Sequence, residues 1–323
     1  MSSLQSRLSA DVRYPTYAVA DGLWVITTYF NPCRYQTRRD NFEVFAHSMR
    51  AAGIPLIIIE CAFGDQEFEL PESLDVVRVR AQSLLWQKER LLNLAASWLP
   101  PECKYVAWLD CDILFKNDLW AKEAADLLKE HAVVQLFETC LRLDKGNVIG
   151  ENPDRVESFG AIAPGNPQLL SCGRYDRHGH TGYGWAMRRE IFDAVGLYEH
   201  TVAGSADHYM AHAIYDSYGF CVEKSLHNNQ RALRHLREWG KRFYRLVQGN
   251  FGVVSGEILH LWHGDLANRR YLQRLIETSD LGFDPYTDFV ARSGQPMEWH
   301  PAIDKKPLKE YMVEYFRDRR EDG

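Results

Sequence analysis

Continuous apolar runs with the length of a β-strand recur along the first 141 residues of the chain. They lie at residues 23–30, 54–63, 75–81, 104–115 and 132–141. Between them, residues 36–52 and 84–99 carry apolar side chains at helical spacing, and glycine or proline follows each segment. Uninterrupted apolar strands separated by helices are typical of a parallel sheet whose two faces are both covered. The pattern therefore predicts an α/β fold, with a mostly parallel sheet and helices on both faces.

The hydrophobic pattern loosens after residue 141. Residues 146–184 are rich in glycine, which indicates loops around a site, and the chain contains no internal repeat, low-complexity tract or linker. We predict one domain over residues 1–323, with a nucleotide-binding half at about 22–140 and an acceptor-binding half at about 141–300.

Composition excludes several classes of protein. The chain is 46% hydrophobic and 25% charged, and its net charge of -6 argues against extensive binding to nucleic acid. No apolar run has the length of a membrane span and no signal peptide is evident, so a cytoplasmic protein is expected. The seven cysteines include no CxxC pair, which predicts reduced, mostly buried thiols rather than a disulfide framework or a zinc knuckle.

Two carboxylates follow the buried run KYVAWL, in the segment KYVAWLDCDILF. In an α/β sheet the carboxyl ends of the strands form the binding crevice, so Asp110 and Asp112 are expected where ligands bind. On a continuous strand these two side chains would point to one face, with Cys111 on the other. Paired carboxylates suit Mg²⁺ or Mn²⁺, which share their other positions with water and substrate phosphates. The alternative is that one aspartate caps a turn and the other is solvated.

In this context the motif resembles the DxD motif of nucleotide-sugar-dependent glycosyltransferases of the GT-A fold, most like family 2. Three further segments strengthen the resemblance: the helical QKERLLNLAASWLP (87–100), the block from TGYGW to AHAIY (181–215), and HLWHG (260–264). The likeness covers roughly residues 22–270. It implies a Rossmann-like GT-A sheet and a donor that is a UDP- or GDP-sugar.

The resemblance also implies a metal site for Mn²⁺ or Mg²⁺. Asp112 would bind the ion directly, Asp110 would bind the ion or the donor ribose, and His263 would be the third protein ligand. His260 competes with His263 for that role. The alternative for His263 is a hydrogen-bonded core histidine beside Trp262.

On the donor side, residues at the end of the first strand would contact the nucleoside, and a lysine on the following helix would join them. These donor-binding residues are Thr27, Thr28, Tyr29, Asn31 and Lys88, with Asp110 shared with the metal. Lys88 and its neighbour Arg90 have a solvated helix surface as their alternative.

Asp207 matches the general base of inverting members, which takes the proton of the acceptor hydroxyl. Those members commonly carry two adjacent acids, whereas Ala206 precedes Asp207 here. The stereochemical outcome therefore stays open, and a helix N-cap is the alternative role for Asp207.

The glycine-aromatic turn in the second half is expected to bind the acceptor through Gly182, Tyr183, Gly184 and Trp185. His178 and His180 beside it either line the acceptor pocket or belong to an exposed loop. His208 and His212 have the i, i+4 spacing of zinc ligands, but no third ligand accompanies them in an HExxH pattern.

A basic segment, residues 224–245, contains seven basic residues and one acid in a chain that is acidic overall. On a helix, Arg231, Arg234, Lys241 and Arg242 would concentrate positive potential and attract the donor pyrophosphate or an anionic acceptor. The alternative is an ordinary solvated helix.

Together these features predict a metal-dependent glycosyltransferase that transfers a sugar to a hydroxyl of a glycan, a small molecule or a modified nucleic-acid base. A related nucleotidyltransferase is disfavoured because TTYFNPCRY lacks a glycine-rich basic loop. A catalytically inactive nucleotide- or sugar-binding module is the other alternative. Donor sugar, acceptor and oligomeric state are left open by these motifs.

Overall fold

A seven-stranded sheet forms the centre of the computed structural model, which describes residues 16–73, 75–171, 177–227 and 229–323. In spatial order its strands are β10 (Phe251–Val253), β6 (Val133–Gln135), β9 (Gly184–Arg188), β4 (Tyr105–Leu109), β1 (Leu23–Tyr29), β2 (Leu56–Phe63) and β3 (Val76–Ala81). Neighbouring strands are parallel, except that β9 runs antiparallel to β4 and β6. The predicted mostly parallel α/β sheet is confirmed.

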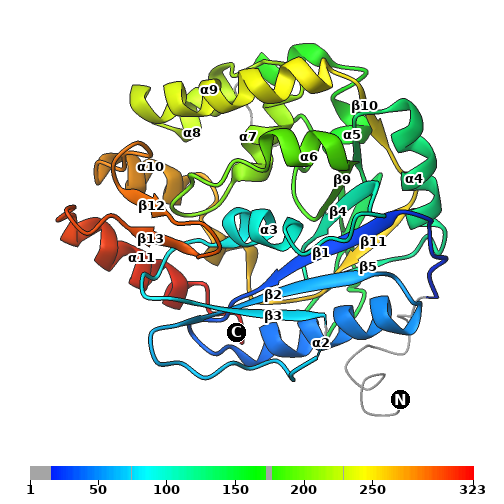
Figure 1. The fold of residues 1–323 in the computed structure, drawn as a ribbon, viewed down its shortest axis with the longest axis horizontal. Coiled ribbons are helices and arrows are strands. Elements are labelled where there is room, and N and C mark those ends of the chain that lie inside the picture. The colour runs from blue at the N-terminus through cyan, green and yellow to red at the C-terminus, as the bar shows by residue number, and fades with distance from the viewer. Residues whose placement is uncertain (1–15, 74, 172–176, 228) are drawn as a thin grey trace.

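Helices cover both faces of this sheet (Figure 1). Val25 and Tyr29 of β1 pack on the face that carries α2 (Gln36–Ala51) and α4 (Trp120–Glu130). Ile26 packs on the opposite face, against α3 (Lys88–Ala96) and α6 (Arg189–Val195). Because successive strand residues point to opposite faces, one apolar strand supplies both cores.

The helix expected over residues 84–99 begins later than predicted. Its N-cap is Gln87, whose side chain exchanges two hydrogen bonds with the backbone of Met297, at 2.8 and 3.0 Å. Met297 belongs to a hairpin of β12 (Phe289–Ala291) and β13 (Met297–Trp299). A tertiary contact with the second half of the chain thus fixes where α3 begins.

A second, four-stranded sheet has the order β5 (Ile113–Phe115), β11 (Glu257–His260), β7 (Thr139–Arg142) and β8 (Asp154–Glu157). Two predictions are corrected here, because residues 104–115 and 132–141 each form two strands that belong to different sheets. The chain leaves the central sheet after Leu109 and turns through Asp110 and Asp112 before β5. Carboxylates inside a buried strand would lack partners, whereas the turn brings them to polar surroundings.

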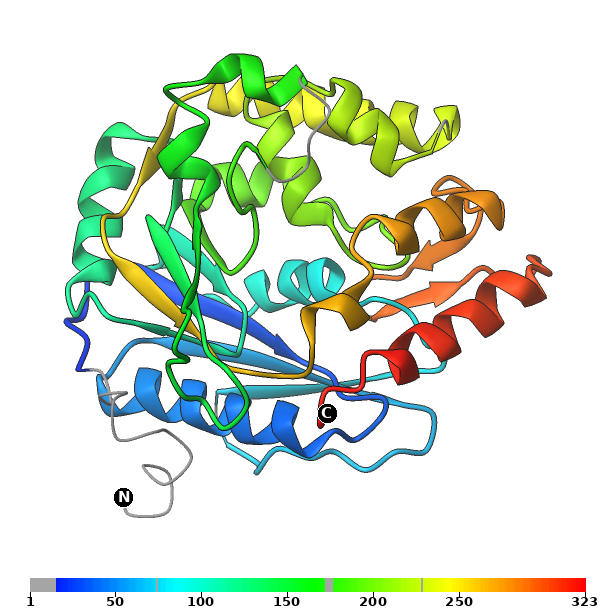
Figure 2. The ribbon, with the colours of Figure 1, turned by 180° about the vertical axis from the view of Figure 1, so that it is seen from behind.

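The remaining helices of the described chain lie over the α6 side of the central sheet or beyond its carboxyl edge (Figure 2). They are α5 (Phe159–Ile162), η1 (Pro167–Ser171), α7 (Ala206–Ala213), α8 (Phe220–Ser225), α9 (Gln230–Val247), η2 (Leu266–Arg269), α10 (Gln273–Asp280) and α11 (Lys306–Asp318). The C-terminal segment lies at the start of α2, where the Asp322 carboxylate accepts hydrogen bonds from the amides of Gln36 and Thr37. The last residues therefore help to build this edge.

Among the described residues, no helix combines the length and the apolar character that crossing a bilayer requires. None of the six described cysteines forms a disulfide, as predicted, and Cys172 lies outside the described residues. The division into a donor half and an acceptor half stays a prediction.

Candidate functional site

A cavity of about 540 Å³ opens beyond the carboxyl ends of β1 and β4. Charged side chains from many elements line it, and basic ones outnumber acidic ones. The basic residues are Arg38, Lys88, Arg142, Arg155, Arg269, Arg274 and Arg319, and the acids are Glu89, Asp110, Asp112, Glu157 and Asp207. Such a surface suits a ligand that is anionic overall and that also carries groups able to donate hydrogen bonds to carboxylates.

Asp112, His260 and His263 form one cluster in this cavity. The Asp112 carboxylate is 3.1 Å from Nε2 of His263 and 3.9 Å from Nε2 of His260, and the two imidazole nitrogens are 2.8 Å apart. Pairing of β11 with β5 produces this arrangement, since the amide of Leu261 donates to the carbonyl of Asp112 at 2.8 Å. Both histidines considered at the sequence level thus lie beside Asp112.

The cluster has the donors that a divalent transition-metal ion prefers. Burial lowers the pKa of His260 to about 4, although Asp112 opposes the shift, so its imidazole is neutral at pH 7. Oδ1 of Asp112 and Nδ1 of His263 are buried and have no hydrogen-bond partner within the described chain. One carboxylate and two imidazoles fit Mn²⁺, and the same donor set holds Fe²⁺ in some oxygenases.

Asp110 binds a different partner. Its carboxylate forms an ion pair with Nζ of Lys88, the first residue of α3. Burial opposes the charge of Lys88, but the carboxylates of Asp110 and Asp207 outweigh burial and raise the pKa of its ammonium group. The expectation that both aspartates point to one face of a strand is wrong, because they lie in a turn. Asp110 is also not part of the Asp112 cluster.

Asp207 lies in the first turn of α7 and lines the cavity. Ser205 occupies the N-cap position of this helix, but its side chain caps no amide, whereas the Asp207 carboxylate accepts a hydrogen bond from the amide of His208 at 2.8 Å. A side chain at position 182 would come within 3.0 Å of Oδ2 of Asp207 and 2.9 Å of the His180 ring. Glycine at this position therefore leaves room for the Asp207 carboxylate beside the loop.

Glu89 also lines the cavity, and the sequence analysis did not single it out. It is buried, and burial raises the pKa of its carboxyl to about 7, while Lys88 opposes the shift. Its burial could have been predicted from the sequence, because Glu89 has helical spacing with Leu92 and Ala96. This spacing places an acid on the apolar face of α3. A carboxyl group with this pKa can hold or release a proton near neutral pH.

Tyr183 has a left-handed backbone conformation, with φ of 76°, and its carbonyl accepts a hydrogen bond from the amide of Asp110 at 2.7 Å. Its ring stacks on His180, with ring centroids 4.2 Å apart, and its hydroxyl accepts from Nε of Arg142 at 3.0 Å. His180 belongs to the cavity wall and is not an exposed loop residue, and burial lowers its pKa to about 3.

Only part of the predicted acceptor-binding set reaches the cavity. Gly182 and Tyr183 line it, whereas Gly184 and Trp185 lie inside β9. A side chain at position 184 would come within 2.9 Å of Leu109, and the indole of Trp185 donates to the carbonyl of Thr181 at 2.8 Å. These two residues serve packing, because they pair with β4 in the centre of the sheet.

The predicted nucleoside contacts divide in a similar way. Thr28 lines the cavity, but Thr27 and Tyr29 point to the other face of β1, as alternation along a strand requires. The Thr27 hydroxyl donates to the carbonyl of Leu109 at 2.8 Å, and the hydroxyl of Tyr29 and the amide of Asn31 both bind the Glu69 carboxylate. Thr27, Tyr29 and Asn31 therefore stabilise the carboxyl end of β1 and its surroundings and do not line the cavity.

The basic segment forms α9, and its four predicted patch residues are exposed: Arg231, Arg234, Lys241 and Arg242. None of these four is among the described residues that line the cavity, and Arg231 is paired with Asp284 at 2.6 Å. The cavity takes its cations from elsewhere. Arg269, Arg319 and Arg38 surround the buried carboxylate of Glu321, at 2.7, 2.7 and 3.5 Å, and the sequence carried no signal for this grouping.

No family model matches the chain, and no curated protein matches it. Solved structures that match include a mutant of Drosophila beta1,4-galactosyltransferase 7 in complex with manganese, UDP-Gal and xylobiose (11% identity, 89% of this chain and 98% of that chain, TM-score 0.39). M. tuberculosis glucosyl-3-phosphoglycerate synthase also matches (12%, 90% and 92%, TM-score 0.38), as does 4-diphosphocytidyl-2C-methyl-D-erythritol synthase from Anaerococcus prevotii (11%, 73% and 88%, TM-score 0.33). Glycosyltransferases, the class that the motifs resemble, are thus among the structures similar to this chain.

Proposed function

We propose that this protein is a metal-dependent glycosyltransferase that moves a sugar from a nucleoside diphosphate to an acceptor hydroxyl. The observation that carries the proposal is the cavity beyond β1 and β4, where Asp112, His260 and His263 cluster on one side and Asp207 and Glu89 lie on another. A metal-binding group, several cations and carboxylates near one another are what this reaction needs.

Asp112, His260 and His263 would hold a divalent ion, which supplies charge neutralisation for the departing nucleoside diphosphate. The chain contributes further positive charge through Lys88, which stays protonated beside Asp110. Arg142 lies opposite His260 in the pairing of β7 with β11, and Tyr183 and Asp154 fix its guanidinium group. These side chains would bind the donor phosphates and orient its sugar.

An aromatic wall beside the charged groups would bind the nucleobase. Phe30 and Trp86 line the cavity and pack edge to face, with ring centroids 5.5 Å apart. Thr28 lies on the same face of β1 and adds a hydroxyl group. This wall replaces Thr27, Tyr29 and Asn31 as the proposed nucleoside contact.

Asp207 would accept the proton of the acceptor hydroxyl as the new glycosidic bond forms. Gly182 lies against its carboxylate and against the ring of His180, so the loop that contains these two residues would form the acceptor side. Glu89 lies near Asp207, and each affects the charge of Lys88. Glu89 is therefore proposed to retain a proton and to limit repulsion in this group of acids.

The test is to incubate the protein with a panel of UDP- and GDP-sugars, with Mn²⁺ or with EDTA, and to identify the products by mass spectrometry. Release of a nucleoside diphosphate that requires Mn²⁺ and Asp112 supports the proposal. Release of pyrophosphate from a nucleoside triphosphate and a sugar phosphate would instead identify a nucleotidyltransferase. Tight binding of a nucleotide sugar without any turnover would identify an inactive binding module.

A further inference from the structure

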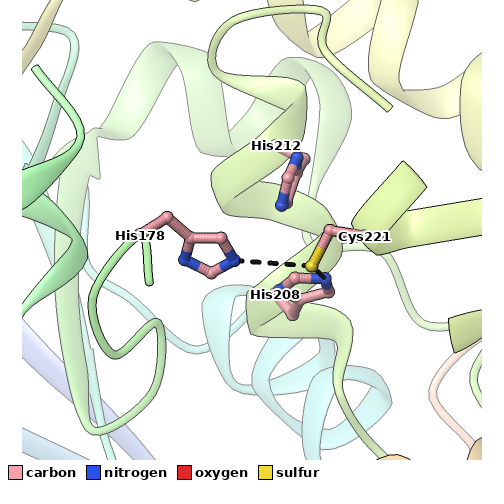
Figure 3. Close-up of side chains that lie close together, drawn as sticks. All are labelled: His178, His208, His212 and Cys221. Carbon is pink, nitrogen blue, oxygen red and sulfur yellow. Dashed lines mark hydrogen bonds between the residues drawn. The ribbon is translucent and has the colours of Figure 1, made fainter. Parts of the chain in front are cut away.

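A second group of metal-type ligands shares no residue with the Asp112 cluster, although one of its members, His178, also lines the cavity. It consists of His178 from the loop before β9, His208 and His212 from α7, and Cys221 from α8 (Figure 3). All four residues are buried, and one ligand atom of each lies within 4.8 Å of those of the other three. Three segments that are separate in sequence thus bring three imidazoles and one thiol together.

The closest spacings fit tetrahedral zinc. Sγ of Cys221 is 3.5 Å from Nε2 of His208 and 3.7 Å from Nε2 of His178. With Zn–S of about 2.3 Å and Zn–N of about 2.0 Å, a tetrahedral site separates nitrogen from sulfur by about 3.5 Å and two nitrogens by about 3.3 Å. The sulfur is therefore already at ligand spacing from two imidazoles, and the remaining ligand atoms lie within 4.8 Å of one another.

Outer hydrogen bonds fix two of the imidazoles in the form that binds metal. Nδ1 of His212 is 2.7 Å from the carbonyl of Ser217, and Nδ1 of His178 is 2.9 Å from the carbonyl of Gly179. A carbonyl oxygen only accepts, so each Nδ1 carries the proton and each Nε2 presents its lone pair. Nε2 of His212 is buried and has no hydrogen-bond partner in the described chain. Such bonds to the second ring nitrogen are typical of metal-binding histidines.

Burial disfavours the protonated form of two of the three imidazoles. It lowers the pKa of His212 to about 4 and that of His208 well below its ordinary value. The thiol of Cys221 would release one proton to solvent when zinc binds.

We propose that His178, His208, His212 and Cys221 bind one zinc ion in a closed, structural site. Four protein ligands fill a tetrahedral shell, so no position is left for a substrate. The site would tie the loop from His178 to Gly182 to α7, whose first turn carries Asp207. This inference does not depend on the proposed glycosyltransferase activity.

Metal content of the intact protein tests the proposal directly. Wild-type protein, purified without added metal and dialysed against EDTA, is expected to retain about one zinc ion per chain by elemental mass spectrometry. Cys221→Ala and His212→Ala should each lose it. Asp112→Asn should retain it, which separates this site from the cluster in the cavity, and so should Cys61→Ala, which removes another buried thiol.

Cobalt gives an independent measurement. Replacement of zinc by Co²⁺ in the wild type should produce thiolate-to-cobalt charge-transfer absorption, and Cys221→Ala should lack that absorption. Wild-type protein that holds no zinc even when zinc is supplied during refolding would overturn the proposal. Equal zinc content in the wild type and Cys221→Ala would do the same. If the variants do not fold, the stoichiometry and cobalt spectrum of the wild type still decide.

Discussion

The carboxylate of Asp112 lies 3.1 Å from Nε2 of His263, although the two residues come from opposite halves of the predicted division of the chain. Asp112 follows a strand of the central sheet, and His263 follows β11 of the smaller sheet. The candidate metal cluster therefore depends on the pairing of β5, which follows Asp112, with β11 in the smaller sheet.

Replacement of Asp112 by asparagine is expected to weaken Mn²⁺ binding by about 100-fold or more, because loss of a ligand should cost at least as much as loss of a residue that supports one. Isothermal titration calorimetry measures this, and circular dichroism checks that the fold survives. Asp126→Asn removes an exposed carboxylate on α4 and serves as the matched control. Mn²⁺ affinity that is equal in both variants and the wild type would show that Asp112 binds no ion. Titrations with Mg²⁺ and Fe²⁺ identify the preferred ion.

For Asp207→Asn we expect turnover to fall by a factor of about 100 or more with little change in donor affinity, since a general base acts in the chemical step. Steady-state kinetics with the accepted donor separates kcat from KM. Asp193→Asn, on the exposed side of α6, is the control. Turnover near the wild-type value would assign the base elsewhere or indicate a retaining mechanism.

Glu89→Gln should change how stability depends on pH. The carboxyl has a pKa of about 7 in the folded protein and an ordinary value of 4.5, so the folded state binds the extra proton between these values. The contribution of the Glu89 carboxyl to the free energy of unfolding is fully present below about pH 4.5. It is lost as the pH rises through 7, by up to about 3 kcal/mol. Glutamine does not titrate, so this pH-dependent loss is absent from the variant. The stability of Glu89→Gln relative to the wild type should therefore be greater at pH 8 than at pH 5. Urea unfolding at both pH values measures this, and parallel pH profiles would contradict it.

Lys88→Met is expected to lower the free energy of unfolding by about 3 kcal/mol, because it leaves Asp110 without its cation in a largely buried site. Adding Asp110→Asn should restore much of that loss, and a double-mutant cycle gives the coupling. Lys129→Met, which removes a lysine paired with Asp126 at the exposed surface of α4, should have little effect. Additive effects of the two cavity substitutions would mean that the pair is not coupled.

The double charge reversal Arg234→Glu with Arg242→Glu tests whether α9 contributes to acceptor binding. Both residues are exposed and outside the cavity wall, so a small acceptor should be used at the wild-type rate. A polyanionic acceptor long enough to reach α9 should bind less tightly, and its affinity for the wild type should fall with salt. Fluorescence anisotropy with a labelled oligonucleotide measures both effects. Binding insensitive to salt and to the reversals would exclude α9 as an anion-binding surface.

The sequence predicted the elements of the central sheet well because their apolar patterns are local. Phe42, Phe45 and Met49 repeat at helical spacing and are buried on α2, as expected. The placement of Asp112 and Asp207 in one cavity followed from strand ends and motif order.

Other parts of the site depend on contacts that no local pattern contains. The turn that separates Asp110 from Asp112 arises because β5 joins β11, and β11 comes much later in the chain. Likewise, the sequence pairs His208 with His212 by spacing alone. His178 and Cys221 join them only because the fold brings their segments to α7. The face that each residue of β1 presents was predictable from alternation, which already separates Thr28 from Thr27 and Tyr29.

The antiparallel pairing of β5 with β11 has a consequence for the kinetics of folding. His260 and Asp112 meet only after a long loop has closed, so the cluster forms after the local elements of the central sheet. An ion that binds this cluster acts on the native state and has no site in the early transition state. Mn²⁺ should accordingly slow unfolding and leave the refolding rate unchanged.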